Sequence, residues 1–257
     1  MILAIDVGNS NIVLGGYSQD TLLFTLRISS DISKTSDELA VNIKSVLAIQ
    51  NIRPENIDGA IISSVVPQLT LSLKEAIKIL TNREAMVVEP GIKTGVNIKI
   101  DNPAQLGSDL LVGCVAALHL YKLPSIIIDM GTATTFSVLD EKGNMIGGAI
   151  MPGVRTAINA LSAKAAQLPF ISIEAPEKAI GTNTVQSMQS GVVFGNAAML
   201  DGMIDRFEKE LGSSCTVIAT GGLAEEISRH TKHEIVYNGE LLLEGLHIIY
   251  KKNTNTK

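Results

Sequence analysis

The stretches Ile5-Asp6-Val7-Gly8-Asn9 and Ile128-Asp129-Met130-Gly131-Thr132 decide how this chain folds. Both read Ile-Asp-x-Gly followed by a polar residue, and they lie roughly half of the 257-residue chain apart. Each ends an apolar run typical of a β-strand, and two more short apolar runs follow at hairpin distance. A four-residue match can arise by chance, but the matching strand context argues against chance. The repeat therefore predicts a duplicated domain, each copy starting with a three-strand meander.

The rest of the chain alternates strands and helices around these two meanders. In the first half, apolar spacing and turn residues predict strands at 1–7, 11–17, 21–28, 58–66 and 87–88, helices at 36–49, 67–80 and 106–120, and mostly loop at 90–103. In the second half they predict strands at 125–130, 134–139, 145–150, 215–219 and 235–237, with helices at 153–168, 184–211, after 222 and at 240–251. A break near Gly195 is expected in the long helix, and a frayed polar tail at 252–257.

Length and composition define the class of protein. A chain of 257 residues fits either one large α/β domain or two domains of equal size. Hydrophobic residues make up 46% and charged residues 18%, which excludes a disordered chain. The repeat favours two domains, which we place at residues 1–118 and 119–257.

Charge and cysteine content exclude several functions. The net charge of −5 and the lack of a Lys/Arg-rich run disfavour nucleic-acid binding. No apolar run reaches the about 18 residues of a membrane span, and the N-terminus lacks the basic region of a signal peptide. Cys114 and Cys215 have neither metal-site nor redox spacing and are interpreted as reduced thiols. We therefore expect a cytoplasmic protein that binds neither nucleic acid nor membranes.

The repeated motif suits phosphate chemistry. Glycine lets the backbone approach an anion, and the N–H groups of a tight turn can bind phosphate oxygens. A carboxylate at a strand end, such as Asp6 or Asp129, can hold Mg²⁺ directly or through water. Two such hairpins facing each other across a cleft would hold a triphosphate from both sides. A third glycine element, Gly221-Gly222, follows a strand and precedes a helix, which suits contact with adenosine or phosphate.

Other interpretations of these residues stay open. An Asp-x-Gly at a strand end is very often only a turn; the duplication and the third glycine element make binding the better interpretation. The chain has no P-loop, no G-x-G-x-x-G and no H-E-x-x-H motif. His230 and His233 lie near a predicted helix end, where a solvated or hydrogen-bonded histidine is commoner than a metal ligand.

Five motifs occur in a characteristic order. They are Asp6-Val7-Gly8-Asn9-Ser10-Asn11, Gly107-Ser108-Asp109, Ile127-Ile128-Asp129-Met130-Gly131-Thr132-Ala133-Thr134-Thr135, Gly147-Gly148-Ala149-Ile150-Met151-Pro152-Gly153 and Thr220-Gly221-Gly222. Over nearly its whole length the chain resembles the type III pantothenate kinases. That family belongs to the acetate and sugar kinase, Hsp70 and actin superfamily. The resemblance implies two duplicated ribonuclease H-like (actin-like ATPase) α/β domains with a nucleotide cleft between them.

The resemblance also implies an activity and residue roles. The activity is ATP-dependent phosphorylation of pantothenate to 4'-phosphopantothenate, the first step of coenzyme A biosynthesis, with Mg²⁺ and K⁺ or NH₄⁺ as cations. Asp129 would bind the monovalent cation, Asp109 would be the general base, and Thr184 would contact substrate from the neighbouring subunit of a homodimer. The nucleotide contacts would come from Asp6, Val7, Gly8, Asn9, Ser10, Asn11, Ile12, Val13 and Thr132. The substrate contacts would come from Gly107, Ser108, Asp109, Leu110 and Thr184.

Two positions depart from the family pattern. The family usually has Gly-Ala-Asp-Arg where this chain has Gly107-Ser108-Asp109-Leu110, and often Tyr where it has Ile100. Losing an Arg partner for the pantothenate carboxylate would cost about 1.5–3 kcal/mol. Either another basic residue compensates, or the substrate is another small hydroxyl compound, or the protein is a weak regulatory paralogue resembling the accessory transcription factors.

Two residue-level alternatives also stay open. Asp109 could act only as a first-turn carboxylate favoured by the helix dipole. The long apolar helix from Thr184 could form a dimer interface or belong to the core.

Overall fold

The computed structural model describes residues 1–254, and these divide into two compact units. Unit 1 comprises residues 1–96 and 102–119 together with the last helix, α7 (Leu241–Thr254). Unit 2 comprises residues 97–101 and 120–240. The boundaries drawn from the sequence group α7 with the second half, whereas its contacts belong to unit 1. Lys252 to Thr254 of the expected frayed tail continue α7, and residues 255–257 lie outside the described residues.

The sheet of unit 1 has the strand order β3-β2-β1-β4-β5. The strands are β1 (Ile2–Val7), β2 (Asn11–Ser18), β3 (Thr21–Ser29), β4 (Gly59–Ser64) and β5 (Met86–Val87). The first three form the predicted antiparallel meander, and β4 and β5 join in parallel. The two apolar faces of β1 explain its central position, because parallel strands are covered on both sides.

The sheet of unit 2 repeats this order and adds one strand. Its order is β11-β10-β7-β8-β9-β6. The strands are β6 (Asn97–Ile98), β7 (Ser125–Met130), β8 (Ala133–Leu139), β9 (Asn144–Pro152), β10 (Thr216–Thr220) and β11 (Ile235–Tyr237). The strands β7, β8, β9, β10 and β11 take the places of β1 to β5, with the same parallel and antiparallel pairings. The predicted duplication is therefore confirmed at the level of topology.

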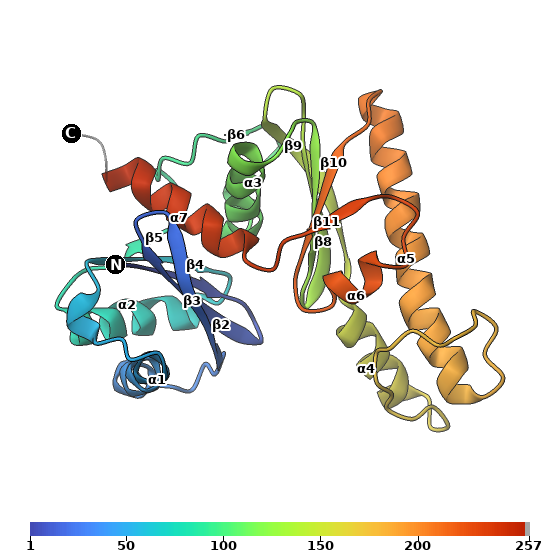
Figure 1. Cartoon of the computed structure of the whole chain (residues 1–257), viewed down its shortest axis with the longest axis horizontal. Helices are drawn as coiled ribbons and strands as arrows, with labels where there is room; N and C mark the ends of the chain where they lie inside the picture. Colours follow the sequence, from blue (N-terminus) through green and yellow to red (C-terminus); the bar gives the residue numbers. More distant parts are fainter. Residues whose placement is uncertain (255–257) are drawn as a thin grey trace. The chain divides into compact units, whose positions relative to one another are not determined.

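The helices of unit 1 cover both faces of its sheet (Figure 1). They are α1 (Ser36–Ile49), α2 (Pro67–Thr81), α3 (Ser108–Leu120) and α7, with short 3₁₀ turns at Pro54–Asn56 and Pro103–Gln105. The helix α1 begins at a capping box in which Thr35 Oγ1 accepts from the Glu38 N–H and Glu38 accepts from the Thr35 N–H. One apolar cluster packs α1 and α2 against β1 and β4, and another packs α3 and α7 on the opposite face.

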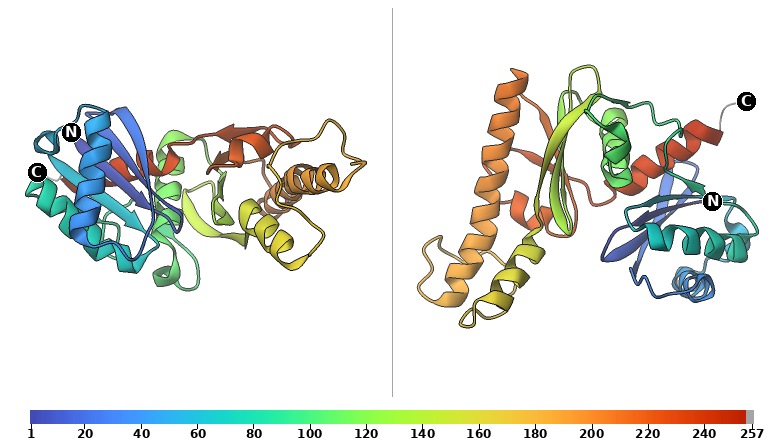
Figure 2. Two further views of the ribbon diagram at one scale, coloured as in Figure 1. Left: turned by 90° about the horizontal axis from the view of Figure 1, so that it is seen from below. Right: turned by 180° about the vertical axis from the view of Figure 1, so that it is seen from behind.

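Unit 2 is covered by α4 (Val154–Lys164), α5 (Thr184–Leu211) and α6 (Ala224–Ser228). The right-hand view of Figure 2 shows α5, in orange, running along the sheet, and its residues Ala197, Leu200 and Ile204 belong to the apolar cluster of this unit. The expected break near Gly195 does not occur. A side chain at Gly195 would meet open space, so this glycine does not mark a packing constraint.

Candidate functional site

The first glycine hairpin joins β1 to β2 in unit 1. Its shape is fixed by the Gly8 N–H, which donates to the Asn11 carbonyl at 3.0 Å, and by Ser30 after β3. The Ser30 N–H donates to the Ser10 carbonyl at 3.1 Å, and the Ser30 hydroxyl donates to the Gly8 carbonyl. Asn9 and the two residues after it are exposed. The hairpin is therefore both rigid and accessible, as a phosphate-binding turn must be.

The second hairpin joins β7 to β8 in unit 2 and is supported in the same way. The Gly131 N–H donates to the Ala133 carbonyl at 3.0 Å, and the Gly153 N–H after β9 donates to the Thr132 carbonyl at 3.0 Å. The Thr156 hydroxyl donates to the same Thr132 carbonyl at 2.8 Å. A Cβ at Gly153 would lie 2.3 Å from the Gly131 carbonyl oxygen, so only glycine fits there.

The third glycine element lies beside the second hairpin. Gly221 has a φ of +98°, and a Cβ on it would lie 2.7 Å from the Met130 carbonyl carbon. The turn after β10 is thus held against the end of β7, next to Gly131. The helix predicted after Gly222 has only five residues, so it adds little dipole and the turn itself must supply any anion contact.

Both predicted metal carboxylates stand beside a hydroxyl on the neighbouring parallel strand. Asp6 of β1 is paired in register with Ser63 of β4, and Asp129 of β7 with Thr220 of β10. Residues in register share a sheet face, so each carboxylate and hydroxyl project to the same side. The two units therefore carry the same pair of oxygen-bearing side chains at the same sheet position.

These residues fit hard cations. Carboxylate and hydroxyl oxygens are the ligands that Mg²⁺ and alkali cations take, and Mg²⁺ commonly uses only one or two carboxylates with substrate phosphates and water. Within residues 1–254 no group of three or more His, Cys, Asp and Glu side chains could hold a metal by itself. A cation at Asp6 or Asp129 would therefore depend on phosphate oxygens and water for the rest of its ligands.

Asp109 lies in the first turn of α3 and is half-buried. Its Oδ1 accepts the Leu110 N–H at 2.8 Å. Burial raises the pKa of this carboxyl above its ordinary value, against the opposing effect of backbone N–H donors. The preceding Ser108 hydroxyl bonds to Ser63 and Ser64 at the end of β4. The structure thus brings Asp109 to the strand that pairs with Asp6 in unit 1.

The two departures from the family pattern also have defined places. Leu110 is half-buried in the first turn of α3, beside Asp109. Ile100 is half-buried in the segment 97–101, which belongs to unit 2. Neither side chain can donate a hydrogen bond to a carboxylate.

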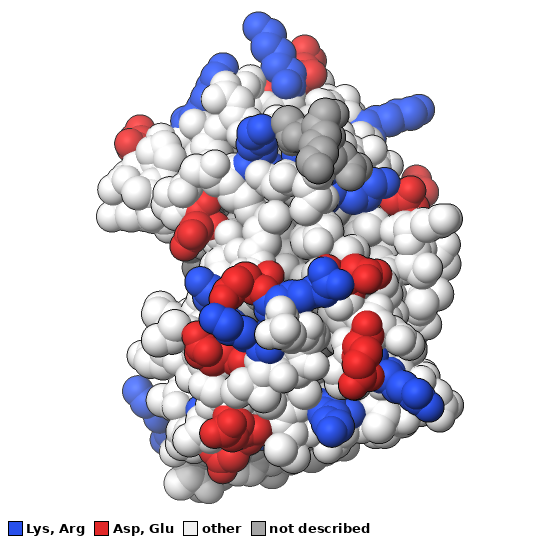
Figure 3. Space-filling view, turned by 90° about the vertical axis from the view of Figure 1, so that its left-hand side faces the viewer, with Lys and Arg blue, Asp and Glu red and all other residues white. Residues whose placement is uncertain are grey.

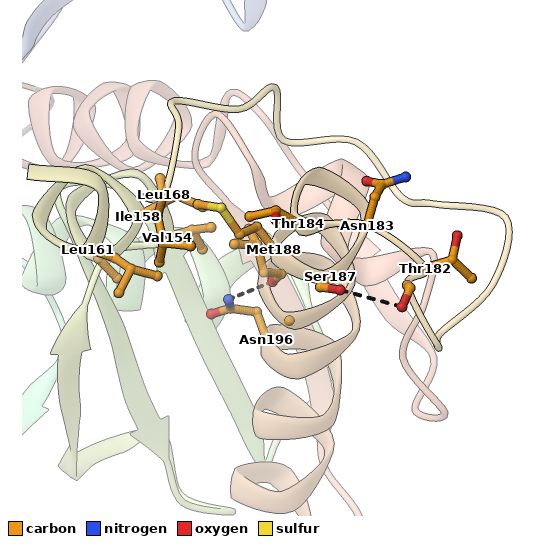
Figure 4. Close-up of a pocket in the computed structure, with 14 residues that line it drawn as sticks. Val154, Ile158, Leu161, Leu168, Thr182, Asn183, Thr184, Ser187, Met188 and Asn196 are labelled. Carbon is orange, nitrogen blue, oxygen red and sulfur yellow. Dashed lines mark hydrogen bonds between the residues drawn. The ribbon is translucent and has the colours of Figure 1, made fainter. Parts of the chain in front are cut away.

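Thr184 begins α5 and lines a cavity of ≈ 700 Å³ inside unit 2. In Figure 4, Val154, Ile158 and Leu161 of α4 form one side of the cavity and Met188 of α5 lies next to them. Asn183 caps the helix by accepting the Gln186 N–H at 2.9 Å. The structure therefore places Thr184 in a hollow of unit 2 that is lined by both apolar and polar side chains.

Surface charge, helix hydropathy and cysteine chemistry complete the description of the chain. On the face drawn in Figure 3, basic and acidic side chains lie intermixed across the middle of the view. In the described part of the chain, no helix combines the length and the apolarity that crossing a bilayer requires. Burial raises the pKa of Cys215 to about 11, so this thiol stays protonated and unreactive at neutral pH.

Sequence reasoning missed Ser63 and Ser64, and it named Thr220 only as part of the motif Thr220-Gly221-Gly222. The available signal was a polar pair ending the apolar run Ile61-Ile62, which is unusual in a strand buried on both faces.

Comparison with solved structures agrees with the two-domain fold. The chain is similar to a putative 2-dehydro-3-deoxygalactonokinase from Sinorhizobium meliloti, with a TM-score of 0.60 at 15% identity over 100% of this chain and 98% of that chain. It is also similar to a conserved putative Baf family transcriptional activator from Campylobacter jejuni. The TM-score is 0.58 at 20% identity, over 98% of this chain and 99% of that chain. At these identities the likeness concerns the fold alone. It confirms the expected α/β fold of two duplicated ribonuclease H-like domains.

Comparison of sequences is more specific. A family model described as type III pantothenate kinase matches residues 2–206. A type III pantothenate kinase of Halalkalibacterium halodurans is 44% identical over 98% of this chain and 100% of the relative. A type III pantothenate kinase of Exiguobacterium sibiricum is 46% identical over 98% of this chain and 100% of the relative. The glycine hairpins, the strand-end carboxylates and these matches together show that the chain belongs to the type III pantothenate kinase family.

Proposed function

We propose that Asp109 is the general base of an ATP-dependent kinase that phosphorylates the primary hydroxyl of pantothenate. Membership of the family gives the activity, the small-molecule substrate, the nucleotide and a divalent metal. The roles of individual residues are our proposal. The observation that carries it is the position of Asp109 at a helix start fixed to the end of β4, the strand that pairs with Asp6.

The reaction needs one proton acceptor and a neutralised phosphate chain. The substrate hydroxyl oxygen forms a bond to the γ-phosphorus of ATP, the bond from that phosphorus to the bridging oxygen breaks, and ADP leaves with the electron pair. The hydroxyl proton passes to Asp109. Burial raises the pKa of this carboxyl, which makes it a stronger base than an ordinary aspartate.

The two hairpins supply the phosphate contacts. In this proposal the backbone and side chains of residues 6–13 and Thr132 bind the phosphates, and Gly221-Gly222 contacts the nucleotide. The support is their rigidity and exposure, since pre-positioned N–H groups stabilise developing charge without reorganisation. Mg²⁺ would neutralise phosphate oxygens near Asp6, and a monovalent cation, K⁺ or NH₄⁺, would do so near Asp129.

The substrate pocket includes a residue from a second subunit in this proposal. Gly107, Ser108 and Leu110 flank Asp109, and Thr184 would reach the substrate from the partner in a homodimer. The cavity beside Thr184 and the exposed apolar residues Phe170 and Ile180 near it support an association there. We place the enzyme in the cytoplasm, in keeping with a sequence whose two cysteines have neither metal-site nor redox spacing.

A second candidate substrate class follows from Leu110. Because this position cannot pair with a carboxylate, a small hydroxyl compound without one remains a candidate. Nothing favours the transcriptional alternative, since the likeness to the Campylobacter jejuni chain concerns the fold alone.

The deciding experiment is ADP release across a panel of hydroxy acids and vitamins with ATP, Mg²⁺ and K⁺. Pantothenate should give the highest kcat/KM of the panel. A higher value for another hydroxyl compound would replace the substrate while keeping the kinase, and no substrate-dependent ADP release would overturn the proposed function.

A further inference from the structure

We infer that Ser108 is a positioning residue whose hydroxyl fastens the first turn of α3 to the end of β4 and so holds Asp109 in place for catalysis. The inference rests on the proposed base role of Asp109 and deepens it. It also assigns a purpose to a side chain that replaces the alanine of the family pattern.

The hydrogen bonds of Ser108 use the whole capacity of its hydroxyl. A serine hydroxyl has one proton to donate and two lone pairs that accept. Ser108 Oγ donates to the Ser64 carbonyl at 3.0 Å, and it accepts from the Ser64 N–H at 3.1 Å and from the Ser63 hydroxyl at 3.0 Å. The hydroxyl is thus fully occupied within the chain, which removes it from the set of side chains that contact substrate.

The partners of Ser108 are themselves fixed. Ser63 is fully buried and pairs in register with Asp6. The Ser64 hydroxyl accepts the Val66 N–H at 3.2 Å and bonds to the Thr70 hydroxyl at 2.9 Å at the start of α2. The fastening therefore connects α3 to a rigid strand end rather than to a mobile loop.

This connection bears directly on Asp109, the next residue along the chain. Its carboxylate is oriented by the Leu110 N–H, and the turn that carries it is closed by the Leu111 N–H, which donates to the Gly107 carbonyl at 3.1 Å. Rotation or fraying of that turn would move the carboxylate. A misplacement of about 1 Å can cost about a hundredfold in rate.

The test compares Ser108→Ala with a matched control, Thr35→Ala. Thr35 is also a hydroxyl at a helix start in unit 1, and its loss removes the cap of α1. Both variants should lower Tm, because each loses hydrogen bonds at the start of a helix. Ser108→Ala should lower kcat by about ten- to a hundredfold. Its KM for ATP should stay within about twofold of wild type, whereas Thr35→Ala should keep the wild-type kcat.

Two further variants keep the inference open to refutation if Ser108→Ala folds poorly. Ser108→Thr retains the hydroxyl and should recover most of the lost kcat. Ser63→Ala removes only one of the three hydrogen bonds and should lower kcat less than Ser108→Ala. Wild-type kcat in Ser108→Ala, or an equal loss in Thr35→Ala, would overturn the positioning role.

Amide hydrogen exchange separates this inference from the proposed function. Ser108→Ala should speed exchange of the Leu111 N–H, and Thr35→Ala should not. Unchanged exchange in Ser108→Ala would overturn the fastening itself. If exchange speeds up but Asp109→Asn keeps the wild-type kcat, the base role and the positioning role both fail, and only the fastening stands.

Discussion

Asp6 and Asp129 occupy the same position in two sheets of the same strand order. Each is the penultimate residue of the first strand of a meander, and each is paired in register with a hydroxyl residue, Ser63 or Thr220, on the next parallel strand. The duplication has therefore preserved the chemistry of the strand end as well as the topology. The two positions still differ on their other side, where Asp6 faces Val13 but Asp129 faces Thr135.

This difference bears on the two cations that we propose for these positions. Thr135 offers a further oxygen on the side where Val13 offers only methyl groups. The turn after Asp129 is also one residue shorter. The Gly131 N–H donates to the carbonyl of Ala133, two residues further on, whereas the Gly8 N–H donates to the carbonyl of Asn11, three residues further on. A site richer in neutral oxygens suits a monovalent cation, whereas Mg²⁺ keeps water and phosphate oxygens as ligands.

Removal of monovalent cations tests the role of Asp129. Replacing K⁺ and NH₄⁺ by a bulky organic cation should lower the kcat of wild type by about tenfold, which is about 1.4 kcal/mol of transition-state stabilisation. Asp129→Asn should be slow and insensitive to added K⁺. Asp205→Asn, an exposed carboxylate of the same unit paired with His233, is the control and should respond to K⁺ like wild type. A K⁺ response retained in Asp129→Asn would assign the cation elsewhere.

Restoring the family arginine tests the substrate. Leu110→Arg should lower the KM for pantothenate by about ten- to a hundredfold, because a guanidinium–carboxylate hydrogen bond contributes about 1.5–3 kcal/mol. Leu110→Gln, which adds length without charge, should change KM far less. An unchanged KM in Leu110→Arg would mean that another group already pairs with the carboxylate or that the substrate carries none.

Gly221→Ala tests the contact between the third glycine element and the second hairpin. The positive φ and the approach of a Cβ to the Met130 backbone make alanine strained, at about 1–3 kcal/mol. We expect a lower Tm and weaker ATP binding. Gly222→Ala, whose Cβ would meet nothing within 4 Å, should leave Tm unchanged. Equal Tm values in the two variants would contradict the close packing of this turn.

The pH dependence of stability tests the burial of Asp109. Its pKa is raised in the folded state, so protonated Asp109 favours folding below the unfolded pKa, and that contribution is lost as the pH rises through the folded pKa. Asp109→Asn removes the cost of the buried charge and should raise Tm at pH 7. The gain should vanish as the pH falls below the ordinary value of 3.8. A lower Tm at pH 7 would mean that the carboxylate is stabilised rather than desolvated.

Local sequence patterns predicted most helices and strands. They did not predict the contacts between residues that lie far apart in the sequence. The apolar runs before Gly8 and Gly131 predicted both meanders, because an alternating or buried strand followed by a glycine turn has few other solutions. The prediction of a helix break near Gly195 was wrong. A helix tolerates a glycine at this position, where an added Cβ would meet open space.

Three long-range features needed the structure. The short strand β6 arises in a segment read as mostly loop, because Asn97 and Ile98 pair with β9. The helix α7 joins unit 1 because Gly245 lets it approach the Val112 carbonyl of α3, where a Cβ would lie 2.2 Å from that oxygen. The hydrogen bonds between Ser108 and Ser64 join residues 44 positions apart in the sequence, and no periodic sequence pattern indicates them.

The central claim is that Asp109 accepts the proton from pantothenate in an ATP-dependent phosphoryl transfer. The most direct measurement is pantothenate-dependent ADP release by wild type and Asp109→Asn, with ATP binding measured by calorimetry on the same samples. We predict a kcat lower by about 10²–10⁴ in Asp109→Asn. Its ATP affinity should stay within about twofold of wild type. Wild-type kcat in Asp109→Asn, with ATP still bound, would contradict the account.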